Sequence, residues 1–121
     1  MAKKVVNIGI MSLENYKDRT MAIVRGEYKP GKNEPKIWFE SFKVLGEVLN
    51  NGNQELLKTI IKHKPQSLKE LAELSGRHTS NLSRSLKTME RIGLVELNRN
   101  GRKVQPTVVA TDFRIEFGLN R

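Results

Sequence analysis

The sequence predicts an α+β fold in which three helices and a β-hairpin follow one another in the second half of the chain. Apolar residues recur at helical spacing in three successive segments, and a residue that ends helices follows each segment. Alternating apolar and polar residues around a glycine then predict the hairpin. The length of 121 residues fits one compact domain with an appendage.

The first of the three helices is expected from about Gln54 to His63. We expect Asn51 and Gly52 to break the preceding element and Asn53 to act as the N-cap. Pro65 lies just beyond the end of this helix. The residues expected to face the core are Leu56, Leu57, Ile60 and Ile61.

The second helix is expected to be short, from about Leu68 to Ser75. Ser67 and Glu70 form the pattern of a capping box, in which each side chain satisfies a free backbone N–H at the helix start. Gly76 is expected to adopt the left-handed conformation that ends many helices.

The third helix is expected from about Thr79 to Ile92 and is amphipathic. Leu82, Leu86 and Met89 have the spacing of one buried face, and Gly93 ends the segment. The opposite face holds short polar and long basic side chains, namely Ser80, Asn81, Ser83, Arg84, Lys87 and Arg91.

A hairpin with a basic tip is expected after the third helix. The strands are expected at Leu94 to Asn98 and at Val104 to Thr111, joined by a turn at Arg99 to Lys103 that contains Gly101. Three helices followed by such a hairpin predict a winged helix-turn-helix, with residues 41–121 as the DNA-binding domain.

Residues 1–40 are expected to form a strand-helix-strand extension. The strands are predicted at Val5 to Ile10 and at Ile37 to Phe39, and a loop at Lys29 to Pro35 precedes the second strand. Ser12 is expected to cap the helix between them, and Ser41 to cap a helix that follows. Alternation in Phe113 to Leu119 predicts a closing strand with one buried face.

The charge of the chain makes a polyanion the first partner to consider. The formal net charge is +9, and residues 60–104 hold ten basic and four acidic residues, against nine and six in residues 1–50. The chain lacks cysteine and any apolar run long enough to cross a bilayer, so we expect a cytoplasmic protein with no membrane partner. A basic surface that serves only solubility is the alternative.

The third helix is expected to enter the major groove of double-stranded DNA. Asn81 can pair with adenine and Arg84 with guanine through two hydrogen bonds each, and the hairpin tip would contact the flanking backbone or minor groove. His78 is open to three interpretations, as a helix cap, a phosphate contact or a spectator. The predicted DNA-binding residues are Arg77, His78, Thr79, Ser80, Asn81, Ser83, Arg84, Lys87, Arg99, Arg102 and Lys103. A solvated helix face is the alternative interpretation of Arg84, Lys87 and Arg91.

Other site chemistries have little support in the sequence. His63 and His78 lie in different elements without clustered carboxylates, so no metal is expected, and no cofactor is expected either. Phosphate-binding glycine loops and nucleophile motifs are absent from the sequence, so we expect no enzyme activity.

The extension has more amphipathic surface than the predicted core needs. Leu13, Tyr16, Met21 and Val24 fall on one helical face, so we expect a homodimer built through this segment, with the last strand as a further candidate contact. The same segment or the loop at Lys29 to Pro35 is equally suited to hold another protein.

Several motifs resemble those of winged helix-turn-helix transcriptional regulators of the MarR and ArsR type. They are Ser67–Ala72 (SLKELA), Asn81–Lys87 (NLSRSLK) and Glu90–Glu96 (ERIGLVE). The whole chain also resembles a family of small predicted regulators, through Phe39–Phe42 (FESF) before the first helix and Gly101–Lys103 (GRK) in the wing. Members of that family are often encoded beside toxin genes, so the resemblance implies an antitoxin that represses its own operon.

The leading expectation is therefore a dimeric, sequence-specific repressor. One rival is an antitoxin that neutralises a toxin protein by direct contact and binds DNA secondarily. Another is a nonspecific chromatin or RNA-binding protein, because winged helices can serve there too.

Overall fold

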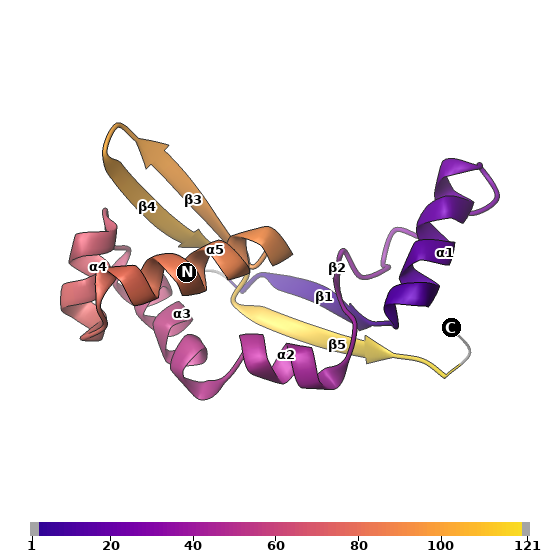
Figure 1. The fold of residues 1–121 in the computed structure, drawn as a ribbon, viewed down its shortest axis with the longest axis horizontal. Helices are drawn as coiled ribbons and strands as arrows, with labels where there is room; N and C mark the ends of the chain where they lie inside the picture. Colours follow the sequence, from indigo (N-terminus) through magenta and orange to yellow (C-terminus); the bar gives the residue numbers. More distant parts are fainter. Residues whose placement is uncertain (1–2, 120–121) are drawn as a thin grey trace. The chain divides into compact units, whose positions relative to one another are not determined.

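The computed structural model describes residues 3–119, which form a mixed α+β structure (Figure 1). Most of the expected elements are confirmed, and their bounds shift by a few residues. In chain order the described elements are β1 (Val5–Ile10), α1 (Leu13–Val24), β2 (Ile37–Phe39), α2 (Phe42–Val48), α3 (Asn51–His63), α4 (Leu68–Ser75), α5 (Thr79–Ile92), β3 (Val95–Asn100), β4 (Lys103–Val108) and β5 (Asp112–Phe117).

The described residues divide into two compact units. Residues 3–4 and 48–111 form one, here called the helical unit, and residues 5–47 and 112–119 form the other, the sheet unit. The expected boundary between residues 40 and 41 assigned both α2 and β5 to the DNA-binding domain. In this division most of α2 and all of β5 belong to the sheet unit instead.

Helix α3 begins three residues earlier than expected. Asn50, not Asn53, is its N-cap, because the Asn50 side chain accepts a hydrogen bond from the Asn53 backbone N–H at 2.9 Å. The Asn53 side chain donates instead to the carbonyl of Val48 at 2.8 Å. Asn51 and Gly52 therefore form the first turn of the helix rather than a break, since a capped N-terminus compensates for their low helix propensity.

Helices α4 and α5 have the expected bounds. The Ser67 hydroxyl accepts from the Glu70 N–H at 3.1 Å, which confirms this half of the capping box. The Glu70 carboxylate, however, accepts from the backbone N–H of Gln66 at 3.2 Å, one residue before the position the pattern predicts. Gly76 and Gly93 end the two helices with positive φ angles of 74° and 101°.

The core of the helical unit is built around one face of α5. Leu82, Leu86 and Met89 are fully buried, as the sequence predicts. Burying each such side chain stabilises the fold by about 1.5–3 kcal/mol, so this face fixes the rotation of α5 about its axis. The buried residues packed in the same unit include Leu56, Leu57, Ile60, Leu71, Leu94, Val95 and Val108.

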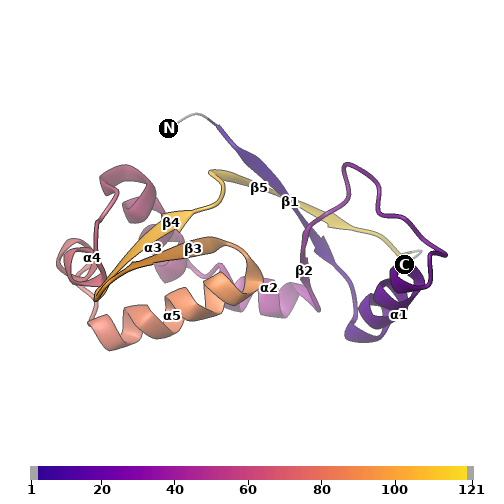
Figure 2. The ribbon, with the colours of Figure 1, turned by 90° about the horizontal axis from the view of Figure 1, so that it is seen from above.

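The hairpin that follows α5 has a tighter turn than expected. Strands β3 and β4 form the hairpin (Figure 2) and are antiparallel. Asn100 lies opposite Lys103, so only Gly101 and Arg102 lie in the turn. Gly101 has a positive φ of 64°, the conformation that a two-residue hairpin turn needs at this position. The expected turn at Arg99 to Lys103 was too long, because Arg99 and Lys103 continue the strands.

The sheet unit holds a three-stranded parallel sheet in the order β2-β1-β5. Ile8 of β1 pairs with Ile37 on one side and Ile115 on the other, and Ile10 pairs with Phe39 and Phe117. Residues paired in this way share a face of the sheet. One face is therefore apolar across all three strands.

The opposite face of the sheet places a glycine beneath an aromatic ring. Gly9 pairs with Trp38, and a Cβ atom built on Gly9 would lie 2.3 Å from the Trp38 ring. The Arg19 guanidinium of α1 stacks 5.0 Å from the centre of the Trp38 ring and 5.8 Å from that of Tyr28. Stacking of this kind ties α1 to the sheet.

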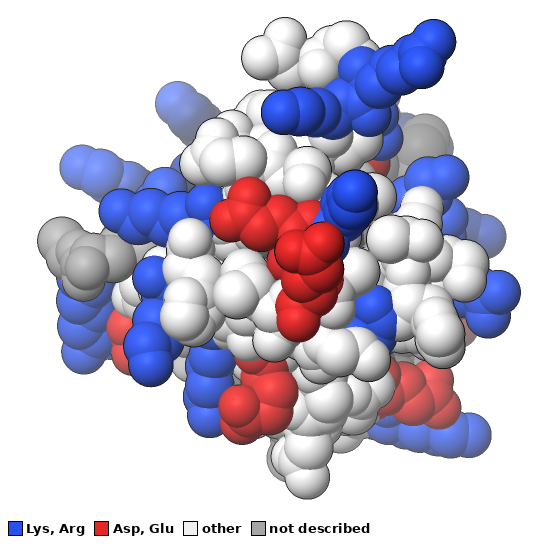
Figure 3. All heavy atoms as spheres, turned by 90° about the vertical axis from the view of Figure 1, so that its left-hand side faces the viewer, with Lys and Arg blue, Asp and Glu red and all other residues white. Residues whose placement is uncertain are grey.

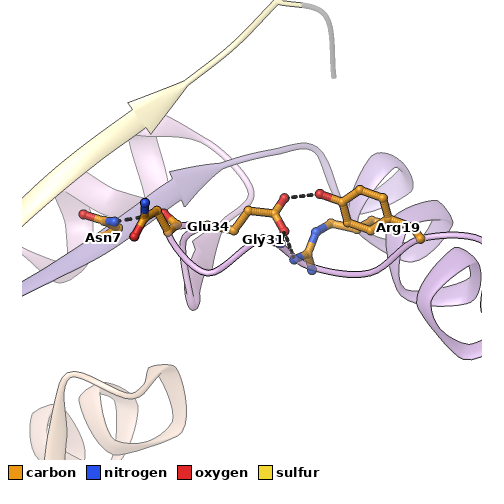
Figure 4. A network of polar contacts seen from close by, with 6 residues as sticks. Asn7, Arg19, Gly31 and Glu34 are labelled. Carbon is orange, nitrogen blue, oxygen red and sulfur yellow. Dashed lines mark hydrogen bonds and ion pairs between the residues drawn. The ribbon is translucent and has the colours of Figure 1, made fainter.

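Glu34 ties the loop after α1 to the helix (Figure 4). Its carboxylate accepts hydrogen bonds from the Tyr28 hydroxyl and the Gly31 N–H, and it pairs with Arg19 at 3.5 Å. The Tyr28 bond, followed by those from Gly31 and Arg19, outweighs desolvation and holds the pKa of Glu34 below its ordinary value of 4.5. These contacts fix the segment that the sequence predicts as a loop.

The closing strand departs from the expected burial. β5 ends at Phe117 rather than Leu119, and the predicted buried face is wrong for two of its three apolar residues. Ile115 is 44% exposed and Phe117 is 52% exposed, although Phe117 meets the Phe42 ring edge-on at 5.1 Å. The alternation predicts the strand correctly, but it does not show whether the apolar face is covered. β2, the other edge strand, is covered at Ile37 and Phe39, whereas β5 is not.

Candidate nucleic-acid interface

The turn between α4 and α5 has three residues, Gly76 to His78. Because Leu82, Leu86 and Met89 face the core, the rest of α5 is turned outward. Asn81, Arg84 and Lys87 are exposed on this surface at a spacing of three residues. The structure therefore places three of the predicted DNA-binding side chains on one exposed side of one helix.

The basic side chains of this surface are not neutralised within the described chain. Arg84 and Lys87 make no ion pair or side-chain hydrogen bond with any residue from 3 to 119. A cation without an internal partner keeps its full charge for an external anion. Ser83 lies beside them and is half-buried.

The N-terminus of α5 has no side-chain cap. His78 occupies the N-cap position with φ −68° and ψ 145°, but its side chain makes no capping hydrogen bond, so the cap interpretation of His78 is wrong. Thr79 and Ser80, the first two helical residues, are exposed. Helix starts of this kind present free backbone N–H groups that can bind phosphate.

Arg77 has intramolecular partners in addition to its predicted role at the DNA. Its Nε donates to Asn81 Oδ1 at 2.7 Å, its Nη2 to Ser85 Oγ at 2.8 Å and its Nη1 to Asn53 Oδ1 at 3.4 Å. One guanidinium thus links the turn, the outward side of α5 and the start of α3. The spacing from Arg77 to Asn81 and Ser85 is visible in the sequence, whereas the contact with distant Asn53 is not.

The hairpin contributes a second group of basic side chains. Arg102 in the turn and Lys103 beside it are exposed and have no ion-pair partner among residues 3–119. Arg99 differs from them, because its Nη1 lies 3.4 Å from a carboxylate oxygen of Glu90. Part of the charge of Arg99 is therefore balanced within the protein.

The charge is unevenly distributed on the end of the helical unit that holds α4 (Figure 3). Acidic side chains lie at the middle and in the lower part of this view, whereas lysine and arginine side chains project at the top, where the hairpin lies. The middle of this surface would repel a phosphate backbone. Basic side chains favourable to an anion are found on the hairpin.

The described residues hold no cluster of metal ligands, but they line hollows in both units. No group of three or more histidine, aspartate or glutamate side chains within residues 3–119 is arranged to hold a metal ion. An apolar hollow of about 200 Å³ lies between α3 and β4, lined in part by Ile60 and Pro106. This volume is below the roughly 300–1,000 Å³ of most ligand pockets, whereas a second hollow of about 450 Å³ in the sheet unit, lined in part by Arg19, Tyr28 and Trp38, falls within that range. No helix among residues 3–119 has the length and apolar character needed to span a membrane.

Comparison with known proteins places the chain in a family. None of the curated proteins matches it. The sequence profile of the HVO_A0114 family matches residues 48–115, more than half of the chain. This match begins where the continuous part of the helical unit begins and ends within β5. The chain therefore belongs to the HVO_A0114 family.

Proposed function

We propose that this protein is a sequence-specific, double-stranded-DNA-binding transcriptional regulator that acts in the cytoplasm as a repressor. In this proposal α3, α4, α5 and the β3–β4 hairpin are a winged helix-turn-helix. Helix α5 is the recognition helix, and the hairpin is the wing.

The observation that carries the proposal is the outward surface of α5. Asn81 and Arg84 are side chains that can form two hydrogen bonds with adenine and guanine, respectively. They are exposed on a helix whose opposite side is locked into the core, as a helix lying in the major groove requires. Lys87 adds a charge one turn further along.

The wing supplies contacts of a different kind. Arg102 and Lys103 project from a two-residue turn and carry unbalanced charge. Contacts with the DNA backbone give affinity and orientation without sequence information. Base recognition by α5 and backbone contacts by the wing account together for a sequence-specific complex.

The proposed regulator acts as a homodimer. Two recognition helices related by a two-fold axis fit successive major grooves about 34 Å apart, so the operator would contain an inverted repeat with half-sites about one turn apart. A footprint on the promoter upstream of the gene, made with the full chain, tests this geometry. Protection of a single half-site at saturation contradicts the dimer.

The decisive experiment compares operator DNA with random duplex of equal length. Arg84→Ala is expected to lower the affinity for the operator more than the affinity for random duplex, because random duplex loses only the charge of Arg84 and the operator also loses the base contact. Lys58→Ala is the matched control, because it removes a basic side chain from α3, in the same unit but outside α5 and the hairpin. If Arg84→Ala bound both duplexes as the parent does, the recognition role of α5 would be wrong. An operator-to-random affinity ratio near one for the parent would indicate a nonspecific binder instead.

A further inference from the structure

Exposed apolar surface is concentrated in one of the two units. Among the described residues, every large apolar side chain classed as exposed belongs to the sheet unit, with the exception of Leu74. The exposed members in the sheet unit are Val5, Leu13, Tyr16, Met21, Val24, Tyr28, Phe42, Ile115, Phe117 and Leu119. A unit this small buries little apolar surface by itself, so it gains most from being covered.

The apolar face of the sheet becomes more exposed toward β5. In the row formed by Ile37, Ile8 and Ile115, the exposed fractions are 7%, 0% and 44%. In the next row Phe39 and Ile10 are both 3% exposed, whereas Phe117 is 52% exposed. The apolar face is thus covered on β2 and β1 and open on β5.

Strand β5 is also an open edge. Among the described strands it pairs with β1 only, and it contains no proline that would prevent a second strand from pairing with it. Apolar side chains on an open strand edge favour pairing with another strand. The unpaired edge of the sheet and the exposed apolar side chains Ile115 and Phe117 are therefore on the same strand, β5.

The sequence of β5 is complementary to itself in an antiparallel register centred on Ile115, which pairs the residues from Phe113 to Phe117. A register centred on Phe113 also opposes Asp112 to Arg114, but it pairs only three residues of the strand. When a second β5 is placed about a two-fold axis at Ile115, Arg114 lies opposite Glu116 of the copy, twice by symmetry. On the apolar face, Phe113 then lies opposite Phe117 of the copy. A shift of the axis to Arg114 would oppose arginine to arginine and Asp112 to Glu116, so like charges disfavour that register.

We propose that a second copy of this chain pairs with β5 antiparallel about an axis at Ile115, joining two three-stranded sheets into one. This inference deepens the proposed homodimer by assigning its interface. The copy is favoured over an unrelated protein because both the charged and the apolar pairs are complementary between identical strands. The proposal places the dimer contact in the sheet unit and leaves the α5 surface available for DNA.

Charge reversal tests the register directly. In Arg114→Glu a glutamate faces Glu116 of the copy, and in Glu116→Arg an arginine faces Arg114 of the copy. Each single variant is expected to weaken self-association by about tenfold or more in sedimentation equilibrium without DNA. The double variant Arg114→Glu/Glu116→Arg restores opposite charges and is expected to dimerise nearly as well as the parent.

Mixing the two single variants supplies a test that misfolding cannot imitate. A heterodimer of Arg114→Glu with Glu116→Arg pairs opposite charges at both positions, so an equimolar mixture is expected to associate when neither variant does alone. Lys36→Glu, a charge reversal just before β2 at the other edge of the sheet, is the control and should leave association unchanged.

Three outcomes would overturn the proposal. They are a monomeric parent, single variants that dimerise like the parent, and a mixture that stays monomeric. If a different protein covers β5, the purified parent chain will be monomeric, which is the first of these outcomes. A monomer that still distinguishes operator from random DNA would overturn the interface alone, whereas a dimer without operator preference would overturn the proposed function alone.

Discussion

Arg77 Nε donates to Asn81 Oδ1 over 2.7 Å, which ties the turn before α5 to a residue proposed to contact a base. The same guanidinium holds Ser85 and Asn53, so it fixes the side-chain amide of Asn81 and the position of the helix start. Arg77 is thus a positioning residue in the proposed interface.

Arg77→Ala is expected to reduce both stability and recognition. Hydrogen bonds made by a charged donor contribute about 1.5–3 kcal/mol, so denaturant unfolding should show a loss of roughly that size. Operator affinity should fall more than affinity for random duplex, because the Asn81 amide is no longer held in place. Arg77→Lys should not rescue either property, since one ammonium cannot span three acceptors in a planar arrangement. Full rescue by lysine would show that only the charge of Arg77 matters.

Arg84→Lys separates charge from geometry on α5. Lysine keeps the positive charge and loses the two-pronged donor that matches guanine, which is worth about 1–3 kcal/mol of discrimination. The ratio of operator to random affinity should therefore fall by about 5- to 150-fold while nonspecific binding persists. Competitive titration of the two duplexes measures that ratio. An unchanged ratio would argue against a direct contact with a base.

The two basic residues at the tip of the hairpin are expected to contribute to the salt dependence of DNA binding. Replacing both Arg102 and Lys103 with alanine should reduce the slope of log affinity against log salt concentration by about 1.8, since each phosphate contact contributes about 0.9. Arg99→Ala should change the slope less, because Glu90 already balances part of the Arg99 charge. Fluorescence anisotropy over a series of salt concentrations gives the slopes. Equal effects of the three residues would contradict this ranking.

Gly9→Ala is expected to destabilise the sheet unit. The new methyl group would meet the Trp38 ring at 2.3 Å, and overpacking of this kind typically costs about 1–3 kcal/mol. Gly46→Ala is the control in the same unit, because nothing lies within 4 Å of its Cβ position. Alanine in helix α2 should stabilise by about 0.5–1 kcal/mol. Thermal unfolding of both variants tests the contrast, and equal melting temperatures would contradict it.

Acid should weaken the contacts made by Glu34. Because its pKa is lowered in the folded state, its contribution to stability is complete above the ordinary pKa of 4.5 and is lost as the pH falls through the lower folded value. Glu34→Gln lacks this contribution, so its stability should converge with that of the parent on acidification. Tyr28→Phe should show part of the effect, since the Tyr28 hydroxyl contributes most to the shift. Parallel pH dependences of parent and Glu34→Gln would contradict the assignment.

Local sequence patterns predicted the elements well. Helices α4 and α5 have the expected bounds because Ser67, Gly76 and Gly93 are local signals, and the buried face of α5 follows from its spacing. The start of α3 was misplaced because Asn50 and Asn53 are both good caps, and only the hydrogen bond to Asn50 distinguishes them.

The same local patterns do not predict contacts between segments that are far apart in the sequence. The stack of Gly9, Trp38 and Arg19 joins three segments far apart in the sequence. The sequence predicts more burial for β5 than the structure shows, because alternation indicates that a strand has an apolar face but not whether another part of the chain covers it. In the candidate interface, exposure of Arg84 was predictable from helical spacing, whereas the contact between Arg77 and Asn53 was not.

The parallel pairing of β1 with β5 has a consequence for the order of folding. Val5 is paired with Asp112, so this pairing joins segments at opposite ends of the described chain and has a large entropic cost of loop closure. The stretch 48–111, which carries α3 to β4, is continuous, so it can fold without that closure. The candidate nucleic-acid interface is therefore expected to fold faster than the sheet whose edge is proposed to meet a second copy.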